Sequence, residues 1–368
     1  MAESIPEEIV VDILLRLPAK SLGRFKCVCK RWRSLISNPG FVRSHLQRLK
    51  ARDSIPSQRI IVGGNPLKTV DYEALDGCGK GRLVVPHWIK IFWVPRIVGS
   101  CDGLVCLIDR SSFHIYNPTT REYIELPGSD VVDQNKLFYG FRSELFYGFG
   151  YDSQSNDYKI VEGVSLGGVD WDVAILSLKS GSWRRIQVQF EEESHLEVFG
   201  MGGVYWNGAL RWCASYGNLR QRGMIMSFDL SEEKFHWELP FPEVDGKIDF
   251  VGLGIHGASL FIYSSSQDPR IEAWIMDEHG RGGSWTKWFS IDCIPAFVNC
   301  NTPLGKKPLA YTRSGKIVLK MYWNQMILFN PEDNTWKEYP IHIDYLNGYA
   351  IYLETLLSPY LGGQPSRN

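Results

Sequence analysis

Two short glycine motifs have the spacing of loops that do chemistry. Residues 163–167 (GVSLG) match the G-x-S-x-G nucleophile elbow of hydrolases, and residues 252–257 (GLGIHG) match the G-x-G-x-x-G loop that cradles phosphates. Both kinds of site need a helix directly after the loop, to lift the serine or to hold the phosphate at its N-terminus. The segments that follow, GGVDWDVAILSL and ASLFIYSS, predict strands instead. We therefore interpret both motifs as turns within a sheet and assign no catalytic residue.

Cysteine and histidine, which often bind zinc, show no metal-binding spacing. The eight cysteines contain no C-x-x-C pair, and the eight histidines contain no H-x-H, H-x-x-x-H or H-E-x-x-H pattern. Buried thiols are the simplest interpretation of the cysteines. No metal and no cofactor is predicted. Cysteines dispersed in this way fit a reducing compartment, so we expect a cytoplasmic and/or nuclear protein.

Charge is distributed unevenly along the 368 residues. The formal net charge is −1, but residues 1–50 hold ten Lys and Arg against four Asp and Glu, which gives this segment +6 and the remainder −7. A nearly neutral chain has no overall field that would hold nucleic acid, and one short patch at residues 183–185 (WRR) does not change this expectation. No apolar run approaches the ~18 residues of a membrane span. Neither nucleic acid nor a membrane is a predicted partner.

The elements that would position any binding residue begin with a helical module at residues 1–49. A capping box formed by Ser4 and Glu7, with Pro6 between them, predicts a helix start. Apolar residues then recur with helical period up to Pro18, and further short helices are expected before and after Asn38-Pro39. Fewer than fifty residues cannot bury this many large apolar groups among themselves. Either a partner or the domain that follows must cover part of them.

The run IPEEIVVDILLRLPAKSLGRFKCVCKRWRSLISNPGF closely resembles the F-box. The family pattern is a Leu-Pro pair, an apolar helix, a second Leu-Pro, then Leu, Val-Cys and Trp, and it is matched here except that isoleucine begins the first pair. The resemblance covers about forty residues. It implies three to four helices that bind a small Skp-family adaptor, which joins F-box proteins to the cullin and RING protein of a ubiquitin ligase.

The resemblance also implies which residues contact the adaptor. Carried over position by position, the contacts fall on Ile5, Pro6, Ile9, Ile13, Leu14, Leu17, Pro18 and Leu22. A second group is expected to be divided between internal packing and the adaptor surface, and it consists of Phe25, Val28, Trp32, Leu35 and Ile36.

A polar linker at residues 50–57 separates this module from an all-β region at residues 58–358, and residues 359–368 form a tail. Short apolar strands and polar turns recur with a period typical of kelch-like propeller blades, roughly 50 residues each. Comparable positions are Tyr116, Leu176, Phe228, Trp274 and Phe329. We predict a β-propeller-like domain of about six blades, in which the last strand pairs with the first to close the ring. A pair of stacked β-sandwiches is the alternative.

Four tryptophans follow polar turns at similar places in these units and are predicted to pack between blades; they are Trp183, Trp237, Trp285 and Trp336. The region also resembles the F-box-associated interaction domain of plant F-box proteins, in GSCDGLVCL at residues 99–107, YNPTTREYIELP at 116–127, FGYDSQSNDYKIV at 149–161 and WNGALRW at 206–212. Together the two resemblances cover nearly the whole chain.

The two resemblances imply the substrate-recognition subunit of a Skp-cullin-F-box ubiquitin ligase, which is not itself an enzyme. The F-box would bind the adaptor, and the β domain would hold a target protein for ubiquitination by separate enzymes. The alternatives are a scaffold that binds partners without ligase activity and an enzyme with a propeller pocket. The sequence does not identify the target. Candidate target-binding loops are residues 128–145, 189–200, 214–223, 264–270 and 297–308.

Overall fold

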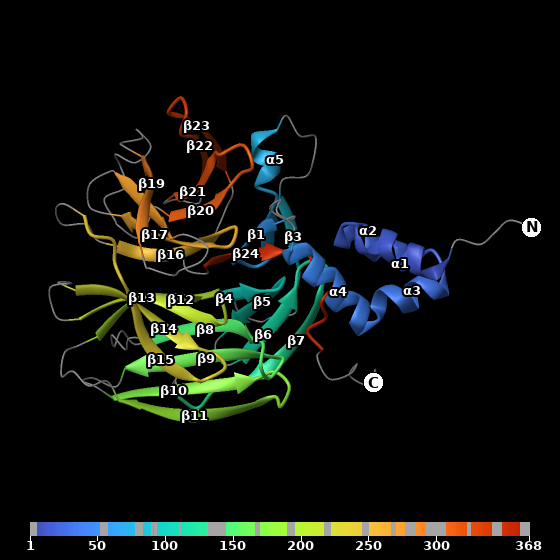
Figure 1. The fold of residues 1–368 in the computed structure, drawn as a ribbon, viewed down its shortest axis with the longest axis horizontal. Helices are drawn as coiled ribbons and strands as arrows, with labels where there is room; N and C mark the ends of the chain where they lie inside the picture. The colour runs from blue at the N-terminus through green and yellow to red at the C-terminus, as the bar shows by residue number, and fades with distance from the viewer. Residues whose placement is uncertain are drawn as a thin grey trace, which may run out of the picture.

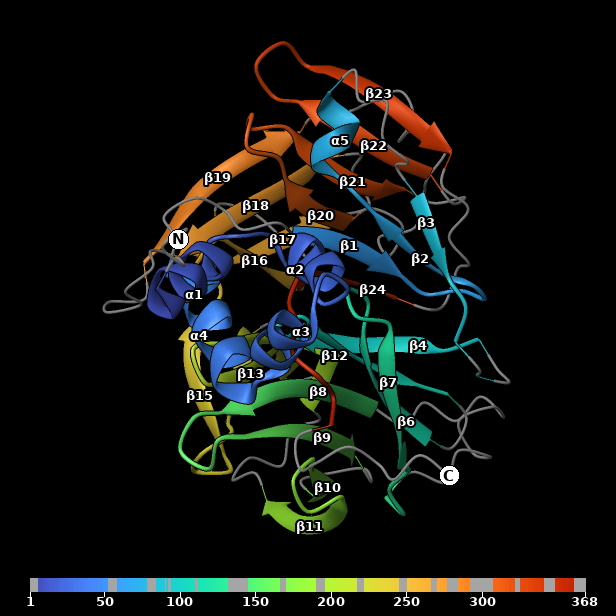
Figure 2. The same ribbon diagram turned by 90° about the vertical axis from the view of Figure 1, so that its right-hand side faces the viewer.

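The computed structural model places four helices on one face of a ring of β-sheets (Figure 1). It describes residues 6–51, 58–77, 84–89, 91, 94–109, 112–131, 145–165, 170–189, 196–216, 222–244, 250–265, 270–276, 284–291, 307–321, 325–340 and 348–360. Figure 2 looks at the ring from the helical side, with the sheets arranged around a common axis behind the helices. Among these residues, no helix is long and apolar enough to cross a membrane.

Short helices make up the N-terminal module. They are α1 (Glu7–Leu15), α2 (Ala19–Phe25), α3 (Lys30–Ser37) and α4 (Pro39–Lys50). Pro6 and Pro18 are the N-caps of α1 and α2 and offer no side-chain hydrogen bond, while Ser4 of the expected capping box lies outside the described residues. The break predicted at Asn38 is confirmed: its side-chain oxygen accepts hydrogen bonds from two backbone N–H groups of α4, at 2.8 and 3.3 Å.

Apart from the short helix α5 (Glu73–Asp76), the remaining elements are strands. One sheet has the order β24 (Tyr349–Leu353), β1 (Gln58–Val62), β2 (Leu67–Val70), β3 (Val84–His87). The next contains β4 (Arg96–Cys101), β5 (Leu104–Ile108), β6 (Ser112–Asn117) and β7 (Glu122–Pro127). Two more four-stranded sheets contain β16 (Phe250–His256), β17 (Ser259–Ser265), β18 (Ile271–Met276) and β19 (Trp285–Ile291), and β20 (Lys307–Tyr311), β21 (Ile317–Met321), β22 (Gln325–Asn330) and β23 (Thr335–Pro340).

The largest sheet has eight strands and joins two four-stranded antiparallel units. Its members are β8 (Leu145–Asp152), β9 (Asp157–Ser165), β10 (Asp170–Ser177), β11 (Ser182–Gln189), β12 (Leu196–Trp206), β13 (Ala209–Tyr216), β14 (Arg222–Asp229) and β15 (Lys234–Pro240). The first strands of the two units, β8 and β12, pair in parallel through Tyr147 and Gly202. The described chain therefore has five hydrogen-bonded sheets where the sequence predicts about six blades, because this parallel pairing merges two units.

The ring closes as the sequence predicts. Strand β24, from the end of the β domain, pairs antiparallel with β1, from its beginning, over the register Gln58↔Leu353 to Val62↔Tyr349. This pairing satisfies the backbone groups of two strands that would otherwise be free sheet edges. The sheet arrangement is that of a propeller, so the alternative of stacked sandwiches is wrong.

The repeat predicted from the sequence is confirmed at the third strand of each unit. Five buried residues occupy this strand, and they are Tyr116 on β6, Leu176 on β10, Phe228 on β14, Trp274 on β18 and Phe329 on β22. These side chains are part of the apolar cores that lie between successive sheets.

Two of the four repeated tryptophans join neighbouring units as predicted. The indole N–H of Trp183 donates to the carbonyl oxygen of Pro127 at 2.8 Å, and that of Trp285 donates to Pro240 at 3.0 Å. Each proline ends the fourth strand of the preceding unit, so the contact repeats. The predicted packing between blades is wrong for Trp336, which is 38% exposed. The side chain of Trp237 lies outside the described part of the chain.

Strand alternation divides the turns of the ring between two faces. Turns that join the first and second strands, or the third and fourth, emerge on one face, and the other connections emerge on the opposite face. Lys50 at the end of α4 pairs with Asp102 in the β4–β5 turn, a first-to-second connection, with 2.5 Å between Nζ and Oδ1. The helical module therefore lies on the first of these faces (Figure 2).

Candidate functional site

An exposed apolar surface lies on α1 and at the junction of α2 and α3. Ile9 and Ile13 are 51% and 50% exposed, and their spacing of four residues places them on one face of the helix. Val28, between α2 and α3, is 63% exposed. The two N-cap prolines, Pro6 and Pro18, are exposed as well. These five members of the predicted adaptor surface are thus accessible to a partner.

Three other predicted contact residues are not accessible. Leu14, Leu22 and Ile36 are at most 1% exposed and pack together in the core of the helical module. The assignment of Leu14 and Leu22 to the adaptor surface is corrected: both side chains are already covered by the chain itself. Ile36 belongs to internal packing, which the sequence left open.

The remaining predicted residues lie at the boundary between core and surface. Leu17, Phe25, Trp32 and Leu35 are half-buried against the helical core, and Ile5 lies outside the described residues. The rings of Phe25 and Trp32 pack with their centroids 5.4 Å apart. These residues therefore contribute to internal packing and still present part of their surface.

Ion pairs fix α1 against the other helices. Asp12 on α1 pairs with Arg48 on α4 at 2.8 Å and with Arg16 one turn along at 2.7 Å. Hydrogen bonds from Arg48 and then Arg16 hold the pKa of Asp12 below its usual value. Arg31 on α3 pairs with Glu7 at 2.9 Å. The helix that carries the two isoleucines therefore contacts α3 and α4 through surface ion pairs.

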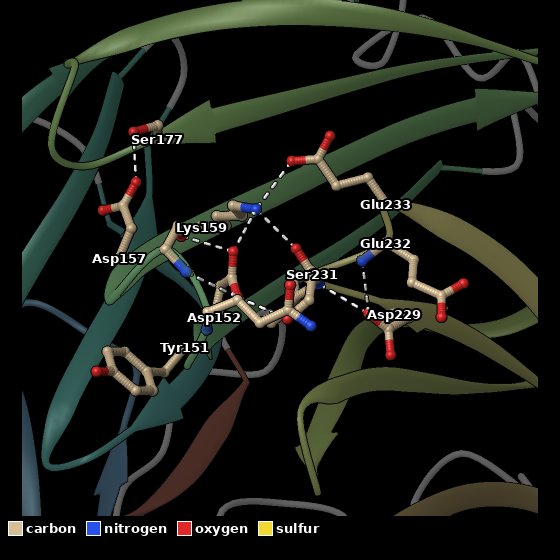
Figure 3. A network of polar contacts seen from close by, with 12 residues as sticks. Tyr151, Asp152, Asp157, Lys159, Ser177, Asp229, Ser231, Glu232 and Glu233 are labelled. Atoms are coloured by element: carbon tan, nitrogen blue, oxygen red, sulfur yellow. Dashed lines mark hydrogen bonds and ion pairs between the residues drawn. The ribbon is translucent and has the colours of Figure 1, made fainter.

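A buried lysine joins two units of the ring (Figure 3). The ammonium of Lys159 on β9 lies 2.8 Å from Asp152 Oδ2, 2.8 Å from Glu233 Oε1 and 2.6 Å from the carbonyl oxygen of Leu230. Burial by itself would raise the pKa of Asp152, but hydrogen bonds from Lys159 and neighbouring serines outweigh burial and lower it. Because these contacts join β9 to the end of β8 and to the β14–β15 turn of the neighbouring unit, we interpret this network as structural.

Two further buried polar groups lie between units. Glu162 on β9 is 1% exposed and accepts a hydrogen bond from Ser129, which follows β7 in the neighbouring sheet. Burial raises the pKa of Glu162 to about 7. His87 on β3 contacts Thr69 at 3.0 Å and the hydroxyl of Tyr116 in the neighbouring sheet at 2.6 Å, and burial lowers its pKa to about 4.

The turn predicted for the second glycine motif is confirmed at Gly257, which lies between β16 and β17 with φ +61°. In the first motif, residues 163–165 lie in β9, which pairs antiparallel with β10, so a strand follows where a nucleophile elbow needs a helix; residues 166 and 167 lie outside the described residues. In GLGIHG, rings from β17 lie across Gly252 and Gly254, where any side chain would collide with them. The part of the chain that the structure describes contains no cluster of three or more His, Cys, Asp or Glu that could hold a metal ion.

The strand ends that flank the five candidate target loops lie on the face opposite the helices. These loops connect second to third strands or fourth to first strands, at residues 128–145, 189–200, 214–223, 264–270 and 297–308. Most of their residues lie outside those described. Their role in target binding stays a prediction.

The sequence missed residues after the last strand that complete the helical module. Leu356 is 4% exposed and packs inside the cluster formed by Leu14, Leu22 and Ile36. The pair Leu356-Leu357 after a strand was a visible signal of a further apolar contact. Sequence periodicity could not show that its partners lie more than three hundred residues earlier.

Comparisons with known proteins agree with this architecture. The F-box domain model matches residues 3–44, and the F-box associated beta propeller domain model matches residues 86–344. An F-box/kelch-repeat protein of Arabidopsis thaliana is 30% identical over 370 residues, covering 97% of this chain and 96% of its own length. The F-box protein CPR1 of the same plant is 31% identical over 354 residues, covering 89% and 82%.

Among solved structures, a complex of an Aleuria aurantia lectin mutant matches 78% of this chain and 96% of the lectin chain at 12% identity. Its TM-score of 0.42 is too low to support any conclusion about this chain. The two domain models and the two Arabidopsis relatives show the family of this chain. The chain belongs to the family of F-box proteins that carry an F-box-associated β-propeller domain.

Proposed function

We propose that this chain is the substrate-recognition subunit of a Skp-cullin-F-box ubiquitin ligase. The observation that carries the proposal is the pair Ile9 and Ile13, which are half-exposed on an F-box helix whose Leu14 is buried in the core of the module. Contiguous exposed apolar residues on a folded module mark an interaction surface. A Skp-family adaptor would cover this surface and join the chain to cullin and RING proteins.

The energetics fit a helix-in-groove contact. Burying an isoleucine completely contributes about 1.5–3 kcal/mol, so covering the exposed half of each contributes about 1 kcal/mol. The exposed Val28 adds a third anchor of similar kind. The three anchors together contribute about 3 kcal/mol, which is less than the cost of association, so further contacts with the adaptor must add to them.

The target protein would bind the face of the ring opposite the F-box. This arrangement holds the target at a fixed distance from the ligase, so that separate enzymes transfer ubiquitin by proximity. The chain itself would be non-catalytic. Burial raises the pKa of the Cys101, Cys106 and Cys213 thiols, which keeps these three protonated and poorly nucleophilic. The five cysteines among the described residues are free, which supports a cytoplasmic and/or nuclear location.

Co-expression of the full chain with a Skp-family adaptor tests the proposal. We expect the Ile9→Asp, Ile13→Asp double variant to bind at least about 100-fold more weakly, because the adaptor would have to bury two charges. Neither substitution disturbs the core, since both side chains are half-exposed. The matched control is the Trp88→Asp, Val94→Asp variant, which changes two exposed apolar residues of the propeller.

Equal binding by the natural chain and the isoleucine variant would contradict the proposed surface. Co-purification of cullin with the complex separates a ligase subunit from a scaffold. If the adaptor binds and cullin does not join the complex, the scaffold function is the better account.

A further inference from the structure

A short segment after the last strand lies between the propeller and the F-box. We call residues 354–360 the C-terminal strap; they follow β24 and pass beside α4 in Figure 1. Of the predicted linker that joins the two modules in sequence, residues 52–57 lie outside the described residues. Among the described residues, the strap connects the propeller to the F-box although it lies far from the F-box in sequence.

On the side of the helices, the strap completes the F-box core. Leu356 is 4% exposed and packs against Leu14, Leu22 and Ile36. It is the one fully buried member of this cluster, within the described chain, that does not come from the helices or the turns between them. Leu357 packs partly against this core and partly against the core between β4–β7 and β8–β11.

On the side of the propeller, side chains hold the strap backbone. The amide of Asn117, a fully buried residue at the end of β6, donates to the carbonyl oxygens of Leu357 at 2.6 Å and Thr355 at 3.2 Å. The hydroxyl of Thr355 donates to the carbonyl oxygen of Asp102 at 3.0 Å. These bonds satisfy buried polar groups, so they resist displacement of the strap.

Ion pairs link the same region to the helices. Lys20 on α2 lies 2.6 Å from Glu354, whose side chain is 7% exposed and also pairs with Arg59 on β1. Lys50 on α4 lies 2.5 Å from Asp102, whose side chain is 6% exposed. Burial alone would lower the pKa of Lys50, but the Asp102 charge outweighs it and raises that pKa. Separating the modules would leave these carboxylates without a lysine partner.

The β4–β5 turn has no room for a side chain beneath the strap. Gly103 has φ +86°, and a Cβ there would collide with the carbonyl oxygen of Leu353 and the side chain of Thr355. Gly208 occupies the equivalent turn between β12 and β13 with φ +81°, and a Cβ there would meet nothing within 4 Å. Both glycines have positive φ, but only Gly103 lies directly beneath other atoms of the chain.

We propose that the C-terminal strap is a positioning element for the F-box: seated on Gly103 and Asn117, it supplies Leu356 to the F-box core and fixes the F-box against the propeller. The C-terminus of the chain thereby determines the stability and orientation of its N-terminal module. The proposal does not depend on the identity of any partner.

Hydrogen–deuterium exchange on the full chain tests the proposal without an adaptor. We expect Gly103→Ala to accelerate exchange of the α2 and α4 amides at least about 10-fold, and Leu356→Ala about 30-fold or more. Gly208→Ala imposes the same backbone strain where there is open space, so it should leave these helices within about twofold of the natural chain. Leu328→Ala, a buried truncation in β22, is the control for general loss of stability.

The comparison between helices and strands decides the outcome. Faster exchange confined to the helices and strap in Gly103→Ala and Leu356→Ala supports the proposal. Unchanged helix exchange in both variants would overturn it. Equal acceleration of the helices by Gly208→Ala or Leu328→Ala would also overturn it, because the F-box would then depend on the whole propeller rather than on the strap.

Discussion

Glu162 and His87 are expected to give opposite pH dependences of stability within one propeller. Burial raises the pKa of Glu162 from 4.5 to about 7 and lowers the pKa of His87 from 6.5 to about 4. Both side chains lie between sheets and are at most 6% exposed. Each shift of about 2.5 units corresponds to about 3 kcal/mol of unfolding free energy.

The signs follow from counting bound protons. Between pH 4.5 and 7 the folded chain keeps the Glu162 proton and the unfolded chain loses it, so this contribution is fully present below pH 4.5 and is lost as the pH rises to about 7. Between pH 4 and 6.5 the unfolded chain binds a proton at His87 and the folded chain does not, so stability rises with pH there. In the natural chain the two slopes oppose each other between pH 4.5 and 6.5.

Single substitutions separate the two contributions. Urea unfolding followed by tryptophan fluorescence gives the unfolding free energy of the natural chain and of Glu162→Gln from pH 4.5 to 7.5. We expect the advantage of the natural chain over Glu162→Gln to fall by about 3 kcal/mol across this range. His87→Gln is the matched control, and its difference curve should have the opposite slope. A flat difference curve for Glu162→Gln would show that this carboxyl is ionised in the folded chain and would refute the reasoning.

Four further substitutions test the packing of the two modules. Leu14→Ala is expected to destabilise the helical module by about 2–5 kcal/mol, because this side chain is buried. Ile13→Ala should cost less than about 1 kcal/mol, because this side chain is half-exposed. Hydrogen exchange of the α1 amides measures both losses. Lys159→Met leaves the buried Asp152 carboxylate without an ion-pair partner, while Glu233 keeps its pair with Arg184, and should cost about 3–5 kcal/mol, measured as a lower urea midpoint. Trp183→Phe keeps a ring between units but removes the hydrogen bond to Pro127 of the preceding unit, so a loss of about 1 kcal/mol is expected in the same assay.

Local patterns predicted the elements that repeat. The helical period of residues 9–17, the break at Asn38 and the spacing of Tyr116 and its equivalents all appear in the structure as expected. Each of these signals is a property of a short segment, since helix period and turn residues act on neighbours in the chain. The closure of the ring was also predictable, because the first and last strands had no other partner.

The division of α1 into buried and exposed residues was not predictable in the same way. Ile13 and Leu14 are adjacent and both apolar, yet one is 50% exposed and the other 1%. A periodic stripe shows which side of a helix is apolar, but the stripe is wider than the surface that the neighbouring helices cover. The position of those helices decides which residue is left for a partner.

The sequence by itself determined an F-box followed by an all-β repeat domain, because these depend on the order and spacing of residues within each segment. Only the tertiary structure decided that Leu356 completes a core begun at Leu14, that β8 and β12 merge two units, and that Lys159 is satisfied by a turn more than seventy residues away. These contacts join segments remote in the chain. Their partners are set by how the ring closes, and no local pattern contains that information.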